Sequence, residues 1–273
     1  ANNTLLSPIH NDVHAPAMPP RDYHPAINLA VKKWGPPPFG NVVSTNAATS
    51  TLINYGEGPD ARWVTFHQTG NGRRDHDYYW YVTEIFNARR PLPAIAGEPY
   101  YAGRRWKDGP QFADVAPEGS EKDNLYCRSA FYGTFLSGAL GGYMYGADGV
   151  VQADIEPEAP IKMWDAFQVE SANQLKHLRT FAFSAGKRYQ ELAPAADLVS
   201  PNKNHSIDDY EGWAYCARTP DKGLFLIYYE KGCPQARVRG AVPERQYEAK
   251  WFDPRSGEWT PAGSGILASS NIG

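Results

Sequence analysis

The alternation of strand-like and helical segments most constrains the fold of this chain. Up to about residue 194, short apolar or β-branched runs recur between stretches whose apolar residues have helical spacing. The predicted elements are, in order, a helix at 24–35, strands at 40–45 and 62–70, a helix at 75–89, a strand at 92–97, a helix at 123–137, a strand at 138–146 and a helix at 164–185. Strands that alternate with helices are typical of βα units, so we predict an α/β fold with a parallel sheet.

The pattern changes after about residue 194, where strand-like runs follow one another without helices. These runs and a tight turn lie at 212–216, 223–229, 246–252 and 253–257. Because antiparallel strands need only short connections, the pattern predicts a small antiparallel β domain. We therefore expect two domains, with residues 1–194 forming the α/β part and residues 195–273 the antiparallel β domain.

Composition excludes several classes of protein. The 273 residues contain 27 Lys and Arg against 30 Asp and Glu, a net charge of -3, and no long basic run, so nucleic acid is not an expected partner. No segment approaches the roughly 20 apolar residues of a membrane helix, and the N-terminal Ala-Asn-Asn-Thr lacks the charged-then-apolar pattern of a signal peptide. A membrane is therefore not an expected partner either.

The cysteines and histidines give no sign of a metal or redox site. Cys127, Cys216 and Cys233 are too few for a disulfide scaffold and form no Cys-x-x-Cys motif. Cys216 and Cys233 either form one disulfide or are two buried thiols, and the second alternative is favoured. No cluster of His and carboxylate residues has the spacing of metal ligands, so we expect no metal and no cofactor.

Aromatic residues make up 13% of the chain, with 17 Tyr and 8 Trp, which excludes a disordered polypeptide. Exposed Trp and Tyr rings are the usual platform for sugars, because the apolar face of a sugar ring stacks on them. We expect most of these rings to pack in the core or under loops and a minority to contact a ligand.

Polar residues follow or end four of the predicted strands, at Ser44–Asn46, His67–Gln68, Glu98 and Tyr143–Tyr145. In parallel (β/α) folds the catalytic groups lie at the carboxyl ends of the strands. Glu98 is the sharpest candidate, because a carboxylate that follows a buried strand among aromatic residues suits a glycosidase nucleophile or acid. The structural alternative is a carboxylate that only accepts hydrogen bonds from loops.

Three segments together resemble one family of enzymes. The runs Pro-Ala-Ile-Ala-Gly-Glu-Pro-Tyr-Tyr at 93–101 and Arg-Ser-Ala-Phe-Tyr-Gly-Thr-Phe-Leu-Ser-Gly-Ala-Leu-Gly-Gly-Tyr-Met-Tyr-Gly at 128–146 resemble the apiosidase-like glycoside hydrolases. The run Trp-Phe-Asp-Pro-Arg-Ser-Gly-Glu-Trp at 251–259 resembles the small β-sandwich that ends many of those proteins, a module described as a collagen-binding domain of a collagenase. The order of the motifs also matches, and the resemblance covers nearly the whole chain.

The resemblance implies a (β/α)8 TIM barrel that hydrolyses a glycosidic bond with two carboxylates, often in pectin or another complex polysaccharide. Glu98 matches the family's catalytic Glu at the end of the seventh strand, which implies the nucleophile. By this count, 63–68 is strand six, 40–45 is strand five, and strands one to four precede residue 1.

We therefore expect the chain to hold strands five to eight of the barrel. The chain is then either a fragment of a longer protein or is completed by a second chain, because half a barrel exposes two sheet edges and its interior. The family's acid/base at the end of strand four is missing from this chain, and acids in loops are the weaker alternative source. These acids are Asp12, Asp22, Asp75 and Asp77.

Other candidate substrate-binding residues each have a structural alternative. His67 and Gln68 are placed to bind sugar hydroxyls or to serve as structural donors, and Tyr143 and Tyr145 either contact the site or pack in the barrel. Tyr100 and Trp106 follow Glu98, and Trp106 is the ring most expected to form a subsite wall. Further residues have weaker claims: His14 and His24 near the first loop, of which His24 alternatively caps a helix, and Arg128, which alternatively forms only a salt bridge.

We expect a secreted or periplasmic glycoside hydrolase that acts on a plant or microbial polysaccharide or oligosaccharide. Its catalytic residue is Glu98, and its substrate-binding residues are His67, Gln68, Tyr100, Trp106, Tyr143 and Tyr145. The alternative is a carbohydrate-binding protein without catalytic activity. Literal collagen binding is a third and weaker alternative.

Overall fold

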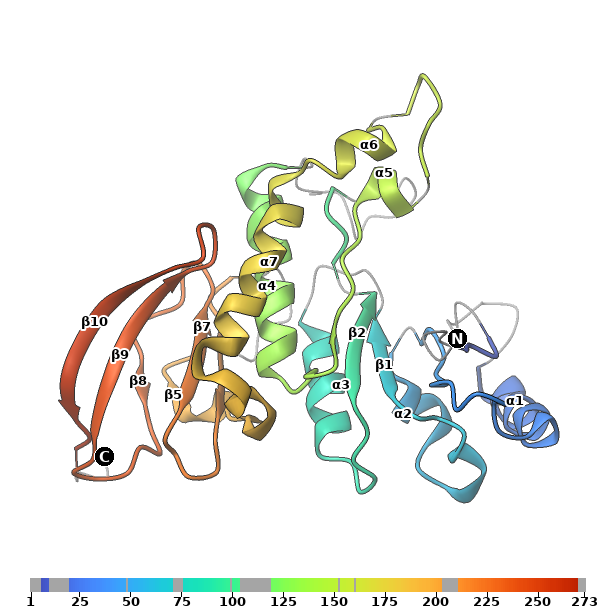
Figure 1. Ribbon diagram of the computed structural model, residues 1–273, viewed down its shortest axis with the longest axis horizontal. Helices are drawn as coiled ribbons and strands as arrows, with labels where there is room; N and C mark the ends of the chain where they lie inside the picture. The colour runs from blue at the N-terminus through green and yellow to red at the C-terminus, as the bar shows by residue number, and fades with distance from the viewer. Residues whose placement is uncertain are drawn as a thin grey trace.

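A computed structural model of the chain describes residues 6–9, 20–47, 49–70, 76–98, 100–103, 119–151, 153–159, 161–202 and 211–269. Figure 1 shows a parallel sheet and a set of antiparallel strands, with helices α4 and α7 between them. Within the described residues, no helix is long and apolar enough to span a membrane.

The elements have the following bounds. The helices are α1 (Pro20–Trp34), α2 (Thr51–Tyr55), α3 (Asp77–Phe86), α4 (Glu121–Leu136), α5 (Asp148–Val151), α6 (Met163–Ala166) and α7 (Glu170–Ala182), with short 3-10 segments η1 (Pro59–Ala61), η3 (Phe183–Glu191) and η4 (Ala196–Leu198). The strands are β1 (His67–Gly70), β2 (Ala94–Glu98), β3 (Gly142–Tyr143), β4 (Ala193–Pro194), β5 (Val199–Ser200), β6 (Ala214–Arg218), β7 (Phe225–Tyr229), β8 (Arg237–Val238), β9 (Gln246–Asp253) and β10 (Glu258–Leu267).

Strands β1, β2 and β3 form a parallel sheet in that order. His67 pairs with Ala94, and Ile95 pairs with Gly142. Helix α3 connects β1 to β2, and α4 connects β2 to β3, which is the βα arrangement that parallel strands require. The predicted α/β class with parallel pairing is confirmed, and the numbering of these strands within an eight-stranded barrel stays a prediction.

Several predicted elements are shorter than expected. The β-branched run at 40–45 forms one isolated bridge, between Val43 and Leu6. The Val43 backbone nitrogen donates to the Thr65 side-chain oxygen at 2.7 Å, so a hydroxyl takes the place of a backbone acceptor in a ladder. The strand predicted at 62–70 begins only at His67 because the 3-10 segment η1, which starts at Pro59, and a turn occupy the residues before it.

Two other segments also differ from their predictions. The glycine-rich run at 138–146 contributes only the two residues of β3. The long helix predicted at 164–185 is divided into α6, α7 and η3, with an extended residue, Val169, capping the start of α7.

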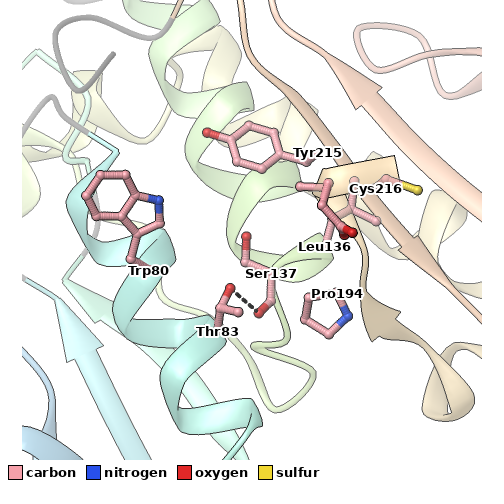
Figure 2. Close-up of a pocket in the computed structure, with 9 residues that line it drawn as sticks. Trp80, Thr83, Leu136, Ser137, Pro194, Tyr215 and Cys216 are labelled. Atoms are coloured by element: carbon pink, nitrogen blue, oxygen red, sulfur yellow. Dashed lines mark hydrogen bonds between the residues drawn. The ribbon is translucent and has the colours of Figure 1, made fainter. Parts of the chain in front are cut away.

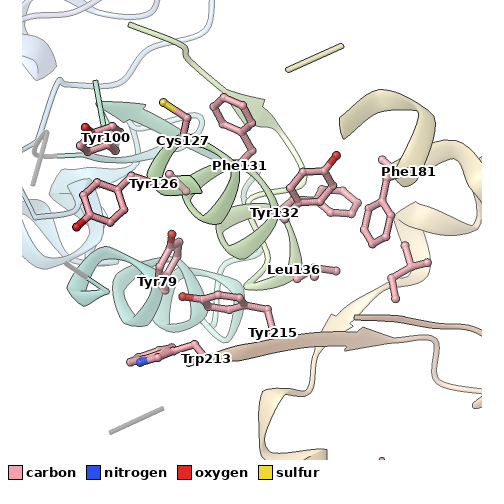
Figure 3. Packing of buried hydrophobic residues seen from close by; sticks show 14 of the residues in the cluster. Tyr79, Tyr100, Tyr126, Cys127, Phe131, Tyr132, Leu136, Phe181, Trp213 and Tyr215 are labelled. Atoms are coloured by element: carbon pink, nitrogen blue, oxygen red, sulfur yellow. The ribbon is translucent and has the colours of Figure 1, made fainter. Parts of the chain in front are cut away.

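Helix α4 is buried on almost every side, with thirteen of its 16 residues removed from solvent. Its rings pack against helices on one side and against later strands on the other. Figure 3 shows Tyr132 of α4 beside Phe181 of α7, and Tyr215 of β6 beneath Tyr79 of α3. Their ring centroids are 5.2 Å and 4.8 Å apart, both in edge-on geometry, which is favourable for aromatic pairs.

The strands after α7 pair antiparallel, as predicted, and we call residues 193–269 the C-terminal β region. Strand β6 pairs with β4 and β7, β5 pairs with β8, and β9 and β10 form a hairpin whose turn is closed by a 2.8 Å bond from the Gly257 nitrogen to the Asp253 oxygen. This region packs on the helices by ring stacking: Tyr132 on Tyr228 at 4.9 Å, and Phe181 on Trp259 at 6.0 Å.

The cysteines are thiols and form no disulfide, so the disulfide alternative for Cys216 and Cys233 is not the one adopted. Cys216 is buried in the C-terminal β region, whereas Cys233 is partly exposed. Burial raises the pKa of the Cys216 thiol to about 12, which leaves it unreactive at neutral pH.

Gly133 allows α4 to approach two rings closely. A Cβ atom there would lie 2.9 Å from the Tyr215 ring and 3.0 Å from the Tyr79 ring. We expect Gly133→Val to lower the free energy of unfolding by about 1–3 kcal/mol, a typical cost of overpacking. Urea denaturation measures this, and Gly58→Val is the control because a Cβ atom at Gly58 meets nothing within 4 Å. Equal losses in both variants would contradict the packing described here.

Candidate active site at the carboxyl end of the parallel sheet

Glu98 is the last residue of β2 and is partly exposed at the carboxyl end of the sheet. Gly70, the last residue of β1, pairs with it across an irregularity in the register. A Cβ atom at Gly70 would lie 2.2 Å from the Glu98 backbone nitrogen, so only glycine allows this approach. The close pairing fixes the backbone that carries the Glu98 carboxylate.

Gln68 lies beside the residue that precedes Glu98. A Cβ atom at Gly97 would lie 2.3 Å from the Gln68 amide nitrogen, which shows that the amide covers Gly97. The same nitrogen donates to Asn46 Oδ1 at 3.0 Å, and the Gln68 backbone nitrogen donates to Thr51 Oγ1 at 2.7 Å. Asn46, Gln68 and Glu98, which come from three of the polar segments singled out in the sequence, therefore lie close to one another in the structure.

His67 does not lie at the carboxyl end of a strand, contrary to the prediction. It is the first residue of β1, its side chain is 1% exposed, and neither ring nitrogen has a hydrogen-bond partner among the described residues. Burial, reinforced by the nearby Arg90 cation, lowers the pKa of His67 to about 4. The ring is therefore neutral at pH 7 and is buried away from solvent.

Tyr100, one of the expected substrate-binding residues, is also buried, and its contact with substrate stays a prediction. Its hydroxyl donates to Asp123 Oδ1 at 2.5 Å, and the Gly103 nitrogen donates to the same oxygen at 2.9 Å. The Gly119 nitrogen donates to Oδ2 at 3.0 Å. Asp123 thus ties the segment just after Glu98 to the start of α4.

Sequence reasoning missed Asp123. Its only signal is the spacing Ser120-x-x-Asp123, which is typical of a helix start, and the Ser120 hydroxyl does accept from the Asp123 nitrogen at 3.2 Å. Burial raises the pKa of the Asp123 carboxyl, and the bonds from Tyr100 and Gly103 oppose this shift. The spacing predicts the cap but not the contact with Tyr100.

Tyr143 and Tyr145 are partly exposed and are held by the helices. The Tyr143 ring packs edge-on against Phe131 of α4 at 4.7 Å, and its hydroxyl donates to the Tyr100 carbonyl at 3.4 Å. The Tyr145 hydroxyl lies 3.0 Å from the Ser171 hydroxyl of α7. These contacts are the packing described by the structural alternative, and contact with substrate stays a prediction for both rings.

The remaining candidates are placed as follows. His24 lies within α1, is 7% exposed and packs against the Tyr55 ring. Arg128 is buried and donates to Glu121 at 2.7 Å and to Gln174 at 2.8 Å, as the salt-bridge alternative describes. Six candidates lie outside the described residues or have side chains outside them. These are Trp106, His14, Asp12, Asp22, Asp75 and Asp77, of which Asp22 and Asp77 have a described backbone only.

No metal centre is found among the residues that the structure describes, since they contain no group of three or more His, Cys, Asp or Glu side chains placed to hold an ion. A cavity of about 310 Å³ lies between α3, the end of α4 and the C-terminal β region (Figure 2). Trp80, Ser137 and Tyr215 are among its lining residues, and none of the predicted site residues lines it. The candidate site is therefore the sheet edge at Glu98 rather than this cavity.

The lowered pKa of His67 predicts how stability depends on pH. The unfolded chain binds a proton at His67 near pH 6.5 and the folded chain only near pH 4, so this contribution is complete above pH 6.5 and is lost as the pH falls through 4. We expect the free energy of unfolding to fall less steeply between pH 7 and 4.5 in His67→Leu than in the wild type. Urea titrations at the two pH values measure this, and parallel slopes would contradict it.

The Asp123 contacts predict a second effect. In Asp123→Ala the Tyr100 hydroxyl and the Gly103 nitrogen lose their acceptor inside the protein, which we expect to cost about 1–3 kcal/mol of the free energy of unfolding. Denaturation at pH 7 measures the loss. Asp165→Ala, an exposed change on α6, is the control, and we expect it to stay within about 0.5 kcal/mol of the wild type. If the Asp123→Ala protein is as stable as this control, the hydrogen bonds from Tyr100 and Gly103 to Asp123 do not stabilise the fold.

Comparison with known proteins places these features in context. The apiosidase-like catalytic-domain family matches residues 13–186, and the family described as a collagen-binding domain of a collagenase matches residues 198–271. No curated protein matches the chain.

Two solved structures share its fold. One, described as a glycoside hydrolase, has a TM-score of 0.66 and 18% identity, over 90% of this chain and 57% of its own length. The other, a glycoside hydrolase family 5 protein from Bacteroides vulgatus, has a TM-score of 0.66 and 16% identity, over 89% of this chain and 54% of its own. The chain thus spans just over half the length of these structures. Because the first family match covers more than half of the sequence, the chain belongs to the apiosidase-like catalytic-domain family.

Proposed function

We propose that this chain is the part of a glycoside hydrolase that carries the catalytic nucleophile, and that the nucleophile is Glu98. The observation that supports this most directly is the position of Glu98, a partly exposed carboxylate at the carboxyl end of a parallel sheet in a member of the apiosidase-like family. This is the end of such sheets at which catalytic groups lie.

In the proposed reaction a Glu98 oxygen attacks the anomeric carbon while the bond to the leaving-group oxygen breaks. The resulting glycosyl-enzyme ester is hydrolysed by water, which restores the carboxylate. A second carboxyl group protonates the leaving oxygen and then deprotonates the water. The solved structures with this fold extend well beyond the matched region, and we propose that the second carboxyl group comes from such a region of the whole protein.

We propose a plant or microbial polysaccharide or oligosaccharide as the substrate, with hydrolysis outside the cytoplasm, where such polymers are encountered. Gln68 is the predicted substrate-binding residue that lies nearest in the sheet to Glu98, because its amide covers Gly97. Tyr143 and Tyr145 remain proposed contacts at the same edge, with their rings anchored on α4 and α7.

The variant Glu98→Gln tests the catalytic role. We expect it to lower kcat/KM by about a thousand-fold or more, because a nucleophile supplies several kcal/mol of transition-state stabilisation. Hydrolysis by the full-length protein is measured on a panel of plant and microbial glycans with a reducing-end assay. Glu84→Gln, an exposed carboxylate on α3, is the matched control and should retain full activity. An active Glu98→Gln protein would refute the assignment.

Chemical rescue separates a nucleophile from a residue that only supports the fold. With Glu98→Gly, sodium azide should restore turnover of an activated aryl glycoside and yield a glycosyl azide, since azide attacks the anomeric carbon in place of the carboxylate. A variant that azide does not rescue would speak against the nucleophile.

A carbohydrate-binding protein without activity is the second candidate. The observation in its favour is Trp251 on β9, which is 61% exposed and is suited to stack on a sugar ring. Binding of a glycan by the wild type and by Glu98→Gln with equal affinity, with hydrolysis by neither, would favour this candidate over the hydrolase.

A further inference from the structure

A buried carboxylate joins the C-terminal β region to the helices that cover the parallel sheet. Glu230 follows β7 and is 4% exposed. Its Oε1 atom accepts from His76 Nε2 at 2.9 Å and from the Ser129 hydroxyl, and its Oε2 atom accepts from the Trp213 backbone nitrogen at 3.0 Å. The Tyr215 hydroxyl lies 3.4 Å from Oε1. Two of these donors come from the C-terminal β region, and two come from the helical side.

His76 is the partner that leads back to the candidate site. Its side chain is fully buried, and its ring stacks on the Trp213 ring with centroids 3.9 Å apart and planes 4° apart. His76 is the N-cap residue that directly precedes α3. The C-terminal β region therefore holds the start of α3 by a hydrogen bond to Glu230 and by ring stacking on Trp213.

Helix α3 in turn packs on the strand that ends at Glu98. Val82 and Ile85 of α3 form a buried cluster with Ala94, the first residue of β2. Helix α3 also contacts β1, whose last residue, Gly70, has its backbone against that of Glu98. A shift of α3 would therefore act on both strands that frame Glu98.

The hydrogen bonds of Glu230 are suited to fixing the relative positions of the elements that they join. A buried carboxylate contributes little net stability compared with apolar residues of the same size, because its desolvation offsets its hydrogen bonds. A buried carboxylate whose two oxygens both accept hydrogen bonds, however, restricts the relative arrangement of the elements that supply the donors. The Glu230 network joins α3, α4 and two strands of the C-terminal β region.

We propose that Glu230 is a positioning residue for glycoside hydrolysis, holding the start of α3 through His76 and thereby setting the strand ends that present Glu98. The C-terminal β region then contributes to catalysis by positioning Glu98, and this role is separate from any binding of carbohydrate by the region. This inference rests on the proposed function.

The first test needs no substrate and uses hydrogen exchange with mass spectrometry on the full-length protein. Glu230→Leu leaves His76 Nε2 and the Trp213 nitrogen without an acceptor, so we expect faster exchange in α3 and in 94–98. Glu230→Gln should restore slow exchange, because its amide oxygen accepts from Trp213 while its NH2 group donates to Ser129 and His76. Val199→Ala, in an apolar cluster internal to the C-terminal β region, is the control for general destabilisation.

The outcomes of this test are distinct. Faster exchange in α3 and 94–98 for Glu230→Leu but not for Val199→Ala supports the proposal. Changes confined to residues 211–230, or the same changes in both variants, overturn it. If Glu230→Leu does not fold, His76→Phe takes its place, since a Phe ring keeps the stacking on Trp213 and cannot donate a hydrogen bond to Glu230.

The second test measures kinetics on an aryl glycoside that the wild type hydrolyses. A misplaced nucleophile slows the chemical step more than it weakens binding, so Glu230→Leu should lower kcat by about 10- to 100-fold with little change in KM. We expect Glu230→Gln to recover most of kcat and Val199→Ala to match the wild type. An unchanged kcat in Glu230→Leu overturns the proposal. If Glu98→Gln proves active, the proposed function fails by itself, and the exchange result still reports whether Glu230 holds α3.

Discussion

The burial of α4 on nearly every side is the constraint on which the rest of the structure depends. A helix with almost no solvent face buries polar side chains, and an unpaired buried polar group is costly. Three of these side chains bind partners on other elements: Asp123 accepts from the segment after β2, Arg128 donates to Gln174 of α7, and Ser129 donates to Glu230. The apolar rings of α4 fill the remaining space. One helix thereby connects the parallel sheet, α7 and the C-terminal β region.

The features that could be predicted from the sequence are those that depend on the spacing of residues close together in the chain. The alternation of apolar runs and helical spacing predicts the parallel sheet, and a carboxylate at the end of an apolar run predicts the place of Glu98 at the strand end. The Ser120-x-x-Asp123 spacing marks the start of α4. The lengths of the strands are less predictable. The Thr65 hydroxyl accepts from the distant Val43 backbone nitrogen, and the turn that follows the 3-10 segment at Pro59 occupies residues predicted to lie in a strand.

The features that sequence reasoning missed depend on contacts between distant residues. His67 and Tyr100 are polar and stand near strand termini, yet both are buried, and Tyr100 packs against Tyr126 of α4. The bond between His76 and Glu230 joins residues 154 positions apart, and no local pattern signals it. The site is therefore predictable to the extent that it lies on a strand end. Its supporting contacts are not, because they arise from how helices and strands pack together.

The stacking of Tyr132 on Tyr228 and of Phe181 on Trp259 has a consequence for how such proteins are built from modules. Each ring pair has one member on a helix and the other in the C-terminal β region. A gene that encoded the helical part without the C-terminal β region would therefore yield a protein with exposed aromatic rings, and the same holds for the C-terminal β region alone. A graft of this region onto another catalytic domain would need matching rings on the recipient's helices. We therefore expect the two parts to be inherited as a matched pair rather than exchanged as independent cassettes.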